Sequence, residues 1–251
     1  MNNLSKTKQI LATSVLSVFL SLSGVAISAP TQKPYGLGIP ISSGTGGAVR
    51  SINTSLVIPL VPDDGGRTAS ERPTFYWYLA DSANFPYKTI FELKDPTDRD
   101  GNVLFKVEGI AEKSGLYKLT LPKNAPALKP DKLYVWQLRM RGSTASSNLQ
   151  TVGSILLSRL DGDMQKAIAK ATTNIEKAQL YSQYGYWFDA LSIYTNQLET
   201  EPKNQDIYKL RSEMILQVFT PQDKDPQLMS NLKSFIDKVN STPKAELLSA
   251  I

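Results

Sequence analysis

Short runs in which apolar and polar side chains alternate dominate residues 56–157, and this alternation is the period of a β-strand with one buried face. Turn signals built from Gly, Pro, Asp and Asn separate the runs. The expected strands cover residues 56–61, 74–79, 89–93, 103–107, 116–121, 133–140 and 151–157. Pro59 marks the first as an edge strand, because proline donates no ladder hydrogen bond. This rhythm predicts an immunoglobulin- or fibronectin-like antiparallel β-sandwich over residues 56–158.

Two tryptophans and one tyrosine are the candidates for the centre of this sandwich. Trp77 lies on the second predicted strand, and Trp136 lies on the sixth, where it is expected to face Trp77. Residues 128–134 resemble a tyrosine corner, in which a tyrosine early in a strand, here Tyr134, bonds the backbone just upstream. The sequence contains no Cys, so the aromatic core has to supply the stability that a disulfide gives many such sandwiches.

After residue 157 the apolar positions recur every three to four residues, which predicts α-helices. Helices are expected at about residues 161–184, 186–199, 205–219 and 226–240. Asp161 or Asp163 and Asn204 are candidate N-caps, whereas Gly185 and Pro202 are expected to end helices. The sequence therefore predicts a second, α-helical domain over residues 161–251, and the overall class is α+β multidomain.

Part of this helical segment is similar to a tetratricopeptide repeat. The matching positions are Ala178, Tyr181, Ala190, Tyr194 and Pro202. Lys177 and Gln197 depart from the repeat, and the chain is too short there for a solenoid. We expect a tetratricopeptide-like helical hairpin that packs on the sandwich.

The first 28 residues have the three parts of a secretory signal peptide. Lys6 and Lys8 give a positive start, an uncharged apolar run follows, and small residues lead to cleavage after Ser28 or after Ala26. A retained membrane anchor is the alternative, but serines interrupt the apolar run, which is shorter than the roughly 20 apolar residues of a span. We expect cleavage and export to the periplasm or the outside of the cell, with the membrane involved only through this signal.

Residues 29–55 are rich in Gly, Pro and Ser and predict a flexible linker. Three glycines fall within residues 44–47, but the Lys-Ser/Thr pair of a phosphate-binding loop is missing. No nucleotide site is therefore expected in the linker.

Composition narrows the possible chemistry, because the 251 residues include no His and no Cys. This excludes Ser-His-Asp triads, thiolate catalysis and metal sites with His or Cys ligands. Without Lys6 and Lys8 the chain has 26 basic and 23 acidic residues, a balance of +3, and the basic residues are scattered. Nucleic acid is therefore not an expected partner. The acidic residues fall mostly in turns and on polar helix faces, where we expect no raised carboxyl pKa.

Residues 95–102 are rich in Asp and contain Gly101, as a calcium-binding loop does. Setting Gly101 at the turn position places Pro96 and Val107 where an EF-hand needs acidic ligands. A hairpin loop is the favoured interpretation.

Ser230 and Lys233 match the S-x-x-K pattern of penicillin-recognising enzymes, but neither S-D-N nor K-T-G follows. We interpret this motif as a solvated helix face. No cofactor and no metal are expected anywhere in the chain.

The aromatic block at residues 75–78 is the strongest candidate for an interaction surface. Strand alternation turns Tyr76 and Tyr78 away from the sandwich core. We favour the interpretation that helices cover these two side chains, and the alternative is that they form an exposed partner-binding strip. Aromatic residues near the start of the second predicted helix raise the same question. The candidate partner-binding residues are Tyr76, Tyr78, Tyr186, Trp187 and Phe188.

Several blocks resemble the cyanobacterial exported family known as domain of unknown function 928. They are the Gly-rich segment 44–50 and residues 60–62, 71–78, 128–136 and 187–191. An Arg-Pro-Thr-Phe block followed by a Trp-x-Asp-Ala-Leu block is the most specific part of this resemblance, which covers about residues 44–220. The resemblance implies an envelope or secreted location and an unassigned activity, and it transfers no catalytic residue.

Together these features predict an exported, non-enzymatic protein-binding or scaffolding component of the cell envelope, whose partner is an envelope protein or a glycan. One alternative is a carboxylate-based hydrolase acting on envelope glycans, which needs two close acids and at least one raised pKa. The other is a glycan-binding module that exposes Tyr76 and Tyr78 on a flat strip.

Overall fold

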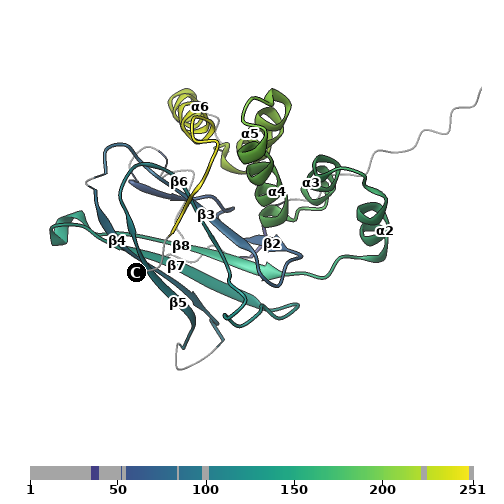
Figure 1. Cartoon of the computed structure of the whole chain (residues 1–251), viewed down its shortest axis with the longest axis horizontal. Coiled ribbons are helices and arrows are strands. Elements are labelled where there is room, and N and C mark those ends of the chain that lie inside the picture. Colours follow the sequence, from purple (N-terminus) through teal and green to yellow (C-terminus); the bar gives the residue numbers. More distant parts are fainter. Residues whose placement is uncertain are drawn as a thin grey trace, which may run out of the picture. The chain divides into compact units, whose positions relative to one another are not determined.

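Nine β-strands and five α-helices make a mixed α+β fold in the part of the chain that the structure describes (Figure 1). The structure is a computed structural model, and it describes residues 35–39, 52, 55–83, 85–97, 102–221 and 225–248. These residues belong to one compact unit, Thr31–Ile251. The predicted signal peptide and most of the predicted linker lie outside the described residues.

The strands form two sheets. They are β1 (Val57–Pro59), β2 (Gly66–Thr68), β3 (Thr74–Leu79), β4 (Tyr87–Lys94), β5 (Val103–Ala111), β6 (Gly115–Thr120), β7 (Leu133–Arg141), β8 (Leu149–Leu157) and β9 (Glu246–Leu247). The four-stranded sheet has the order β1-β3-β6-β9, and the five-stranded sheet has the order β2-β8-β7-β4-β5. Neighbouring strands run antiparallel except in the pairs β2–β8 and β6–β9, which are parallel. β1, which contains Pro59, is an edge strand as predicted.

Aromatic side chains from both sheets form the core between them. Phe75 of β3 lies with its ring centroid 5.0 Å from that of Phe91 in β4 and 5.6 Å from that of Trp136 in β7. Trp77 stacks on Tyr117 of the neighbouring strand β6, at 5.9 Å. All of these side chains except that of Tyr117 are wholly inaccessible to solvent. Since burial of large aromatic surface dominates core energetics, this cluster holds the two sheets together without a disulfide.

The predicted contact of Tyr134 with the backbone upstream is present. The hydroxyl oxygen of Tyr134, in β7, accepts a hydrogen bond from the backbone N–H of Lys129 at 2.9 Å. Tyr134 is itself buried, so this bond satisfies a polar group that the core would otherwise leave unpaired. The contact fixes the loop that leads into β7.

The α-helices follow the last strand of the five-stranded sheet. They are α2 (Gly162–Lys170), α3 (Asn174–Gln183), α4 (Trp187–Thr200), α5 (Gln205–Phe219) and α6 (Pro226–Asn240), and a short 3-10 helix spans Ala145–Ser147. The N-cap side chains of Asp161, Asn204 and Asp225 accept hydrogen bonds from backbone N–H groups in the first turns of α2, α5 and α6.

The expectation of one continuous helix over about residues 161–184 is wrong, because the chain breaks into α2 and α3. At the break, the side chain of Thr173 accepts a hydrogen bond from the backbone N–H of Glu176 at 3.1 Å. The carboxylate of Glu176 in turn accepts one from the backbone N–H of Thr173 at 3.1 Å. This reciprocal capping box starts a new helix. Two successive β-branched threonines favour the extended backbone that the cap requires.

The helices pack on the outer face of the four-stranded sheet and at the β2 edge of the other sheet. Tyr78 of β3 meets Phe235 of α6 edge-to-face at 5.6 Å. Phe188 of α4 reaches Phe75 at 5.8 Å, so α4 contributes to the core between the sheets. A Cβ added to Gly66 in β2 would lie 3.0 Å from the ring of Phe188, so glycine allows this close approach.

Two strands have no counterpart in the prediction. The glycines at residues 65–66 predict a turn, so β2 was not expected; its three residues pair with the end of β8. β9 has only two residues, which is too short for an alternating pattern to predict a strand. Both strands form through tertiary pairing alone, which local sequence patterns do not record.

Candidate functional site

The five aromatic residues selected from the sequence are all buried in the structure. Tyr76 and Tyr78 lie on the outer face of β3, where helices cover them, and their solvent-exposed fractions are 1% and 3%. Tyr186, Trp187 and Phe188 are buried at and just before the start of α4. Their contacts in this structure are therefore with other parts of the same chain. Tyr78 is the one among them that also lines a cavity.

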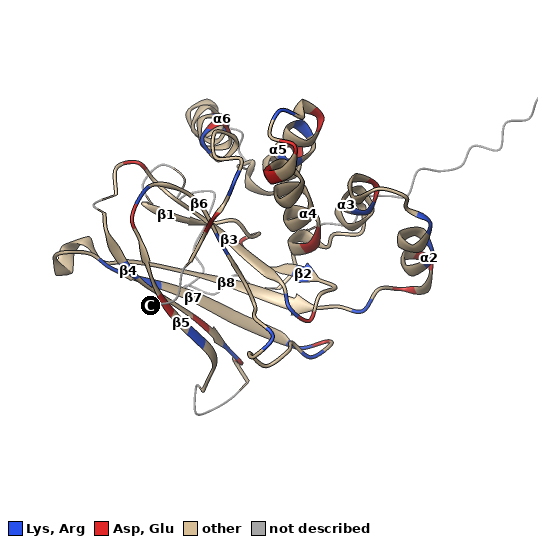
Figure 2. Cartoon of the chain, viewed as in Figure 1, with Lys and Arg blue, Asp and Glu red and all other residues tan. Residues whose placement is uncertain are grey.

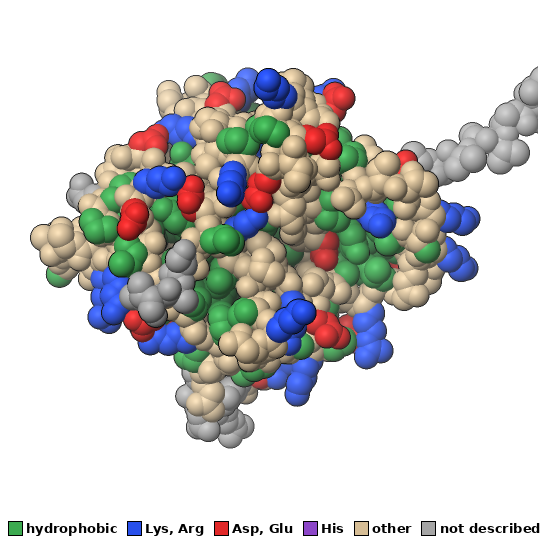
Figure 3. Space-filling model, in the orientation of Figure 1, with side chains coloured by type: hydrophobic (Ala, Val, Ile, Leu, Met, Phe, Trp, Pro, Cys, Tyr) green, Lys and Arg blue, Asp and Glu red, His purple; other side chains and the backbone are tan. Residues whose placement is uncertain are grey.

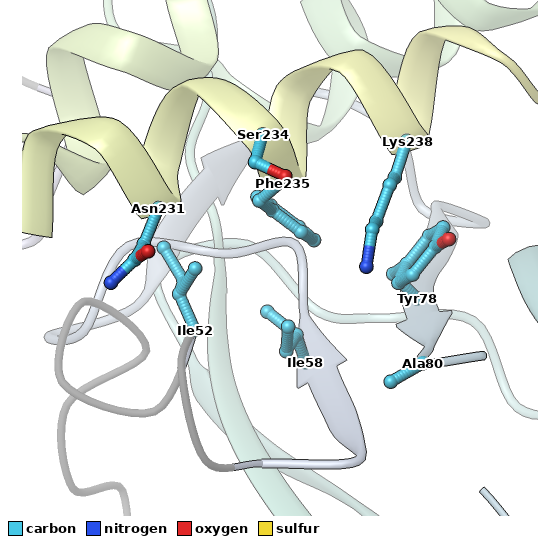
Figure 4. A pocket seen from close by; sticks show the side chains of 8 residues that line it. All are labelled: Ile52, Ile58, Tyr78, Ala80, Asn231, Ser234, Phe235 and Lys238. Carbon is cyan, nitrogen blue, oxygen red and sulfur yellow. The ribbon is translucent and has the colours of Figure 1, made fainter. Parts of the chain in front are cut away.

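This cavity lies between β1, the end of β3 and α6, and we call it the α6 cavity (Figure 4). Its volume is about 300 Å³. The residues that line it are Ile52, Ile58, Tyr78, Ala80, Asn231, Ser234, Phe235 and Lys238. A volume of about 300 Å³ is at the lower end of the range for small-ligand sites.

The walls of the α6 cavity divide by chemistry. The side facing the sheet is apolar, with Ile58 and Ala80 next to the ring of Tyr78. The polar groups come from α6, where Asn231, Ser234 and Lys238 share one face of the helix because they are spaced three and four residues apart. Apolar side chains therefore line one side of the cavity and polar side chains the other.

One ion pair lies at the rim of the α6 cavity. Lys238 Nζ is 3.5 Å from Asp81 Oδ2, and both side chains are about half exposed, at 49% and 61%. Such an exposed pair contributes little to stability. Burial, assisted by the negative charge of Asp81, raises the pKa of Tyr78 to about 12. The Tyr78 hydroxyl therefore stays protonated and is available as a hydrogen-bond donor.

A second cavity of about 300 Å³ lies among α3, α4, α5 and the segment at residues 35–39. Tyr35 lines it, shares a hydrogen bond with the hydroxyl of Ser182 and meets Trp187 edge-to-face at 5.2 Å. Its polar lining includes Gln179 and Glu213. Tyr35, which belongs to the predicted linker, is buried, so residues upstream of the first strand already help to form this wall.

Asp189 contradicts the expectation that no carboxyl group has a raised pKa. Burial raises its pKa from 3.8 to about 6, although the carboxylate accepts a hydrogen bond from the backbone N–H of Ala69 at 2.9 Å. The sequence carries a partial signal, because Asp189 interrupts the apolar run that begins α4, but the residues that cover its carboxyl group lie in and just after β2. No second carboxyl group acts on Asp189 among the described residues.

The guanidinium group of Arg211 is buried among α5, α6 and β3. Its Nη2 donates to the carbonyl oxygen of Val239 at 3.3 Å and to Asn240 Oδ1 at 2.9 Å. Its Nε and Nη1 have no hydrogen-bond partner in the protein. Burial lowers the pKa of Arg211 to about 10, so it still carries its charge at neutral pH.

The other sequence motifs show no catalytic arrangement. Asp95 pairs with Lys132, and Thr97 donates to Asp95, interactions that lower the Asp95 pKa to about 2. The central part of that loop, residues 98–101, lies outside the described residues. In the described ranges, no group of three or more Asp or Glu side chains is arranged to hold a metal ion. Ser230 and Lys233 both face solvent on α6.

Charged side chains of both signs are interspersed over the face of the molecule seen in Figure 3. Both signs occur on β4, β5, α2, α3, α5 and α6, whereas β1, β3 and β8 carry no charge (Figure 2). Among the described helices, none combines the length and the apolar character needed to cross a membrane.

These features define a class, a mixed α+β protein of two facing sheets with a helical layer. The family model described as Domain of Unknown Function (DUF928) matches residues 43–225, most of the chain, and the chain belongs to this family. The match includes the Arg-Pro-Thr-Phe and Trp-x-Asp-Ala-Leu blocks.

Comparison with curated proteins gives no significant match. Among solved structures, the chain is similar to Astrotactin-2, described as a conserved vertebrate-specific and perforin-like membrane protein involved in neuronal development, at 12% identity. The match has a TM-score of 0.26 and covers 70% of this chain and 36% of that one. The chain thus spans about a third of Astrotactin-2, and so low a TM-score carries no argument about fold or function.

Proposed function

We propose that the protein is a non-catalytic binding component of the cell envelope, and that the α6 cavity receives part of a partner protein. The observation that carries the proposal is the pairing of an apolar wall with a single accessible lysine, Lys238, at the rim. This chemistry fits a large apolar side chain of the partner that inserts next to the ring of Tyr78. It also fits a neighbouring carboxylate that replaces Asp81 at Lys238.

Binding rather than catalysis is supported by the distribution of acids. Hydrolysis of a glycosidic bond by carboxylates requires two acidic groups within about 10 Å of each other. Asp189 supplies one acid with a raised pKa, but its interactions are with backbone and hydroxyl groups of β2 and the turn after it. A glycan-binding strip would need Tyr76 and Tyr78 at the surface, and both are covered. The protein partner is therefore the better supported of the predicted partners.

The proposal includes an immunoglobulin- or fibronectin-like topology for the two sheets. Two strand orders support it: β1-β3-β6 is the order expected for strands A, B and E, and β8-β7-β4-β5 is the order expected for G, F, C and an additional C′ strand. The hydrogen bond between Tyr134 and Lys129 supports the same assignment, because it lies at the start of the strand equivalent to F.

The proposal also includes a tetratricopeptide-like hairpin formed by α3 and α4. Ala178 and Ala190 are wholly buried, as small residues between two closely packed helices must be. Tyr194 is buried on the same helix as Ala190, and Pro202 follows the end of α4. These are the positions at which the sequence resembles the repeat.

Export from a cyanobacterial cell is the remaining part of the proposal. It rests on the signal-like residues 1–28 and on the resemblance to the exported family. Comparing the mass of the chain in the cell envelope with that of the full 251 residues tests it, because cleavage after Ser28 or Ala26 removes a defined mass.

The binding proposal is tested by cross-linked capture from native envelopes with four variants of the full chain. Ser234→Trp fills the α6 cavity and Lys238→Glu reverses the charge at its rim, and we expect both to abolish capture of one reproducible protein partner. Ser230→Trp and Lys233→Glu make the same changes at positions of α6 that are equally exposed but do not line the cavity, and they should leave capture unchanged. Equal capture by all four variants, or capture of nothing above background by the wild type, would overturn the proposal.

A further inference from the structure

Strand β5 has an open edge. It is nine residues long, stands last in the five-stranded sheet and pairs only with β4 among the described strands (Figure 1). Two of the four large apolar side chains exposed in the described part of the chain, Val103 at 41% and Ile110 at 42%, lie on this one strand. A long edge strand with exposed apolar side chains presents free backbone N–H and C=O groups to any second strand.

The outer face of β5 carries one lysine and one glutamate. Alternation places Lys106, Glu108 and Ile110 on this face, because Phe105 points to the core and contacts Phe91. Leu104 is the extra residue of a β-bulge opposite Leu93 and Lys94, and it packs against the core. Lys106 Nζ lies 2.7 Å from Glu108 Oε1, and both charges are visible on β5 in Figure 2. Their spacing of two residues makes the strand suitable for pairing with a copy of itself.

Antiparallel pairing of two β5 strands around a two-fold axis keeps both outer faces on the same side of the joined sheet. The axis must then pass through a residue rather than between two residues, because side chains alternate. An axis through Val107 pairs residues 105–109, which lie in the regular part of the strand, and sets Lys106 opposite Glu108 of the second copy, twice. An axis through Lys106 or Glu108 sets like charges opposite each other, which is unfavourable.

We propose that β5 is a homodimerisation edge, at which two copies of this chain pair antiparallel about Val107 and join their five-stranded sheets. The same register places Phe105 opposite Gly109 of the second copy. Charge complementarity between Lys106 and Glu108 selects this register. The occupant of this edge is therefore the same strand of a second molecule. This inference is independent of the α6 cavity.

The test exploits the two-fold symmetry of the pairing. Lys106→Glu gives a strand with two acidic residues, and Glu108→Lys gives a strand with two basic residues. Each variant alone should dimerise at least about tenfold more weakly than the wild type in sedimentation analysis of the full chain. An equimolar mixture of the two should dimerise as well as the wild type, because every facing pair is then opposite in charge.

Lys166→Glu and Glu71→Lys supply the matched control, since they make the same charge changes at exposed positions away from β5. Alone or mixed, they should dimerise like the wild type. Circular dichroism and thermal unfolding establish that each variant is folded. A wild-type chain that stays monomeric at about 100 µM, far above the micromolar range of specific association, overturns the inference. So does a dimer that neither β5 variant weakens.

Discussion

Trp187 donates its indole N–H to the backbone carbonyl oxygen of Leu60 at 2.8 Å, and both groups are buried. This bond connects the first turn of α4 to the segment between β1 and β2. The two segments are far apart in the sequence. The contact therefore belongs to the attachment of the helical layer to the sheets.

We expect Trp187→Phe to lower the free energy of unfolding by about 1–3 kcal/mol more than the control Trp77→Phe does, because the Leu60 carbonyl loses its partner in the protein interior. Trp77 is a suitable control because it is equally buried and its indole N–H has no hydrogen-bond partner. Urea unfolding of the two variants gives the difference. Equal destabilisation would show that the bond to Leu60 contributes nothing beyond packing.

Asp189 should make folding stability depend on pH. Because its pKa is about 6 in the folded protein and 3.8 ordinarily, the protonated group favours the folded state. Its contribution is complete below about pH 3.8 and is lost as the pH rises through about 6. Between about pH 4 and pH 7, the stability of Asp189→Asn should therefore improve relative to the wild type by about 2 kcal/mol.

Urea unfolding at several pH values measures this shift. Asp163→Asn, which removes an exposed carboxyl from the first turn of α2, is the control for the change in net charge. A constant difference between Asp189→Asn and the wild type across this pH range would contradict the pKa of Asp189.

Gly153 and Trp136 face each other on neighbouring strands, and glycine leaves room for the indole ring. A Cβ on Gly153 would lie 2.6 Å from Trp136 Cε2, which is too close for a rigid ring in a packed core. We expect Gly153→Ala to lower the melting temperature and to cost about 1–3 kcal/mol of stability. Gly162→Ala meets no atom within 4 Å in the first turn of α2, and it should be neutral or slightly stabilising.

Replacement of Arg211 should separate its packing from its charge. Arg211→Met keeps most of the volume and removes a buried guanidinium with two unpartnered nitrogens, so stability should stay equal or rise by about 1–2 kcal/mol. Arg211→Ala leaves a cavity and should cost about 2–4 kcal/mol. A large loss in Arg211→Met, measured by urea unfolding, would instead indicate that the bonds to Val239 and Asn240 outweigh the cost of burying the charge.

Local patterns identified most of the strands and helices, because alternation and the 3.6-residue period depend only on which side chains face a core. They also located the pairing of Tyr134 with the backbone before β7. They missed the break at Thr173, where a capping box outweighed a continuous apolar stripe. Asp189 was missed because its burial comes from β2 and the turn after it, which are distant in the sequence.

The α6 cavity could not be found from the sequence for a related reason. Its polar residues look like the solvated face of an amphipathic helix, and only the packing of α6 places them next to Ile58. Tyr78 was selected because alternation turned it away from the core, although the pattern did not show that helices cover it. The cavity exists only because the tertiary fold places the polar face of α6 next to Tyr78 on the outer face of the sheet.

The short strand β9 brings the end of the chain back to the four-stranded sheet, where it pairs with β6 and the backbone N–H of Leu248 donates to the carbonyl oxygen of Lys118 at 3.2 Å. A contact between such distant parts of the chain slows folding. The closure of this sheet by β9 is therefore expected among the late steps of folding.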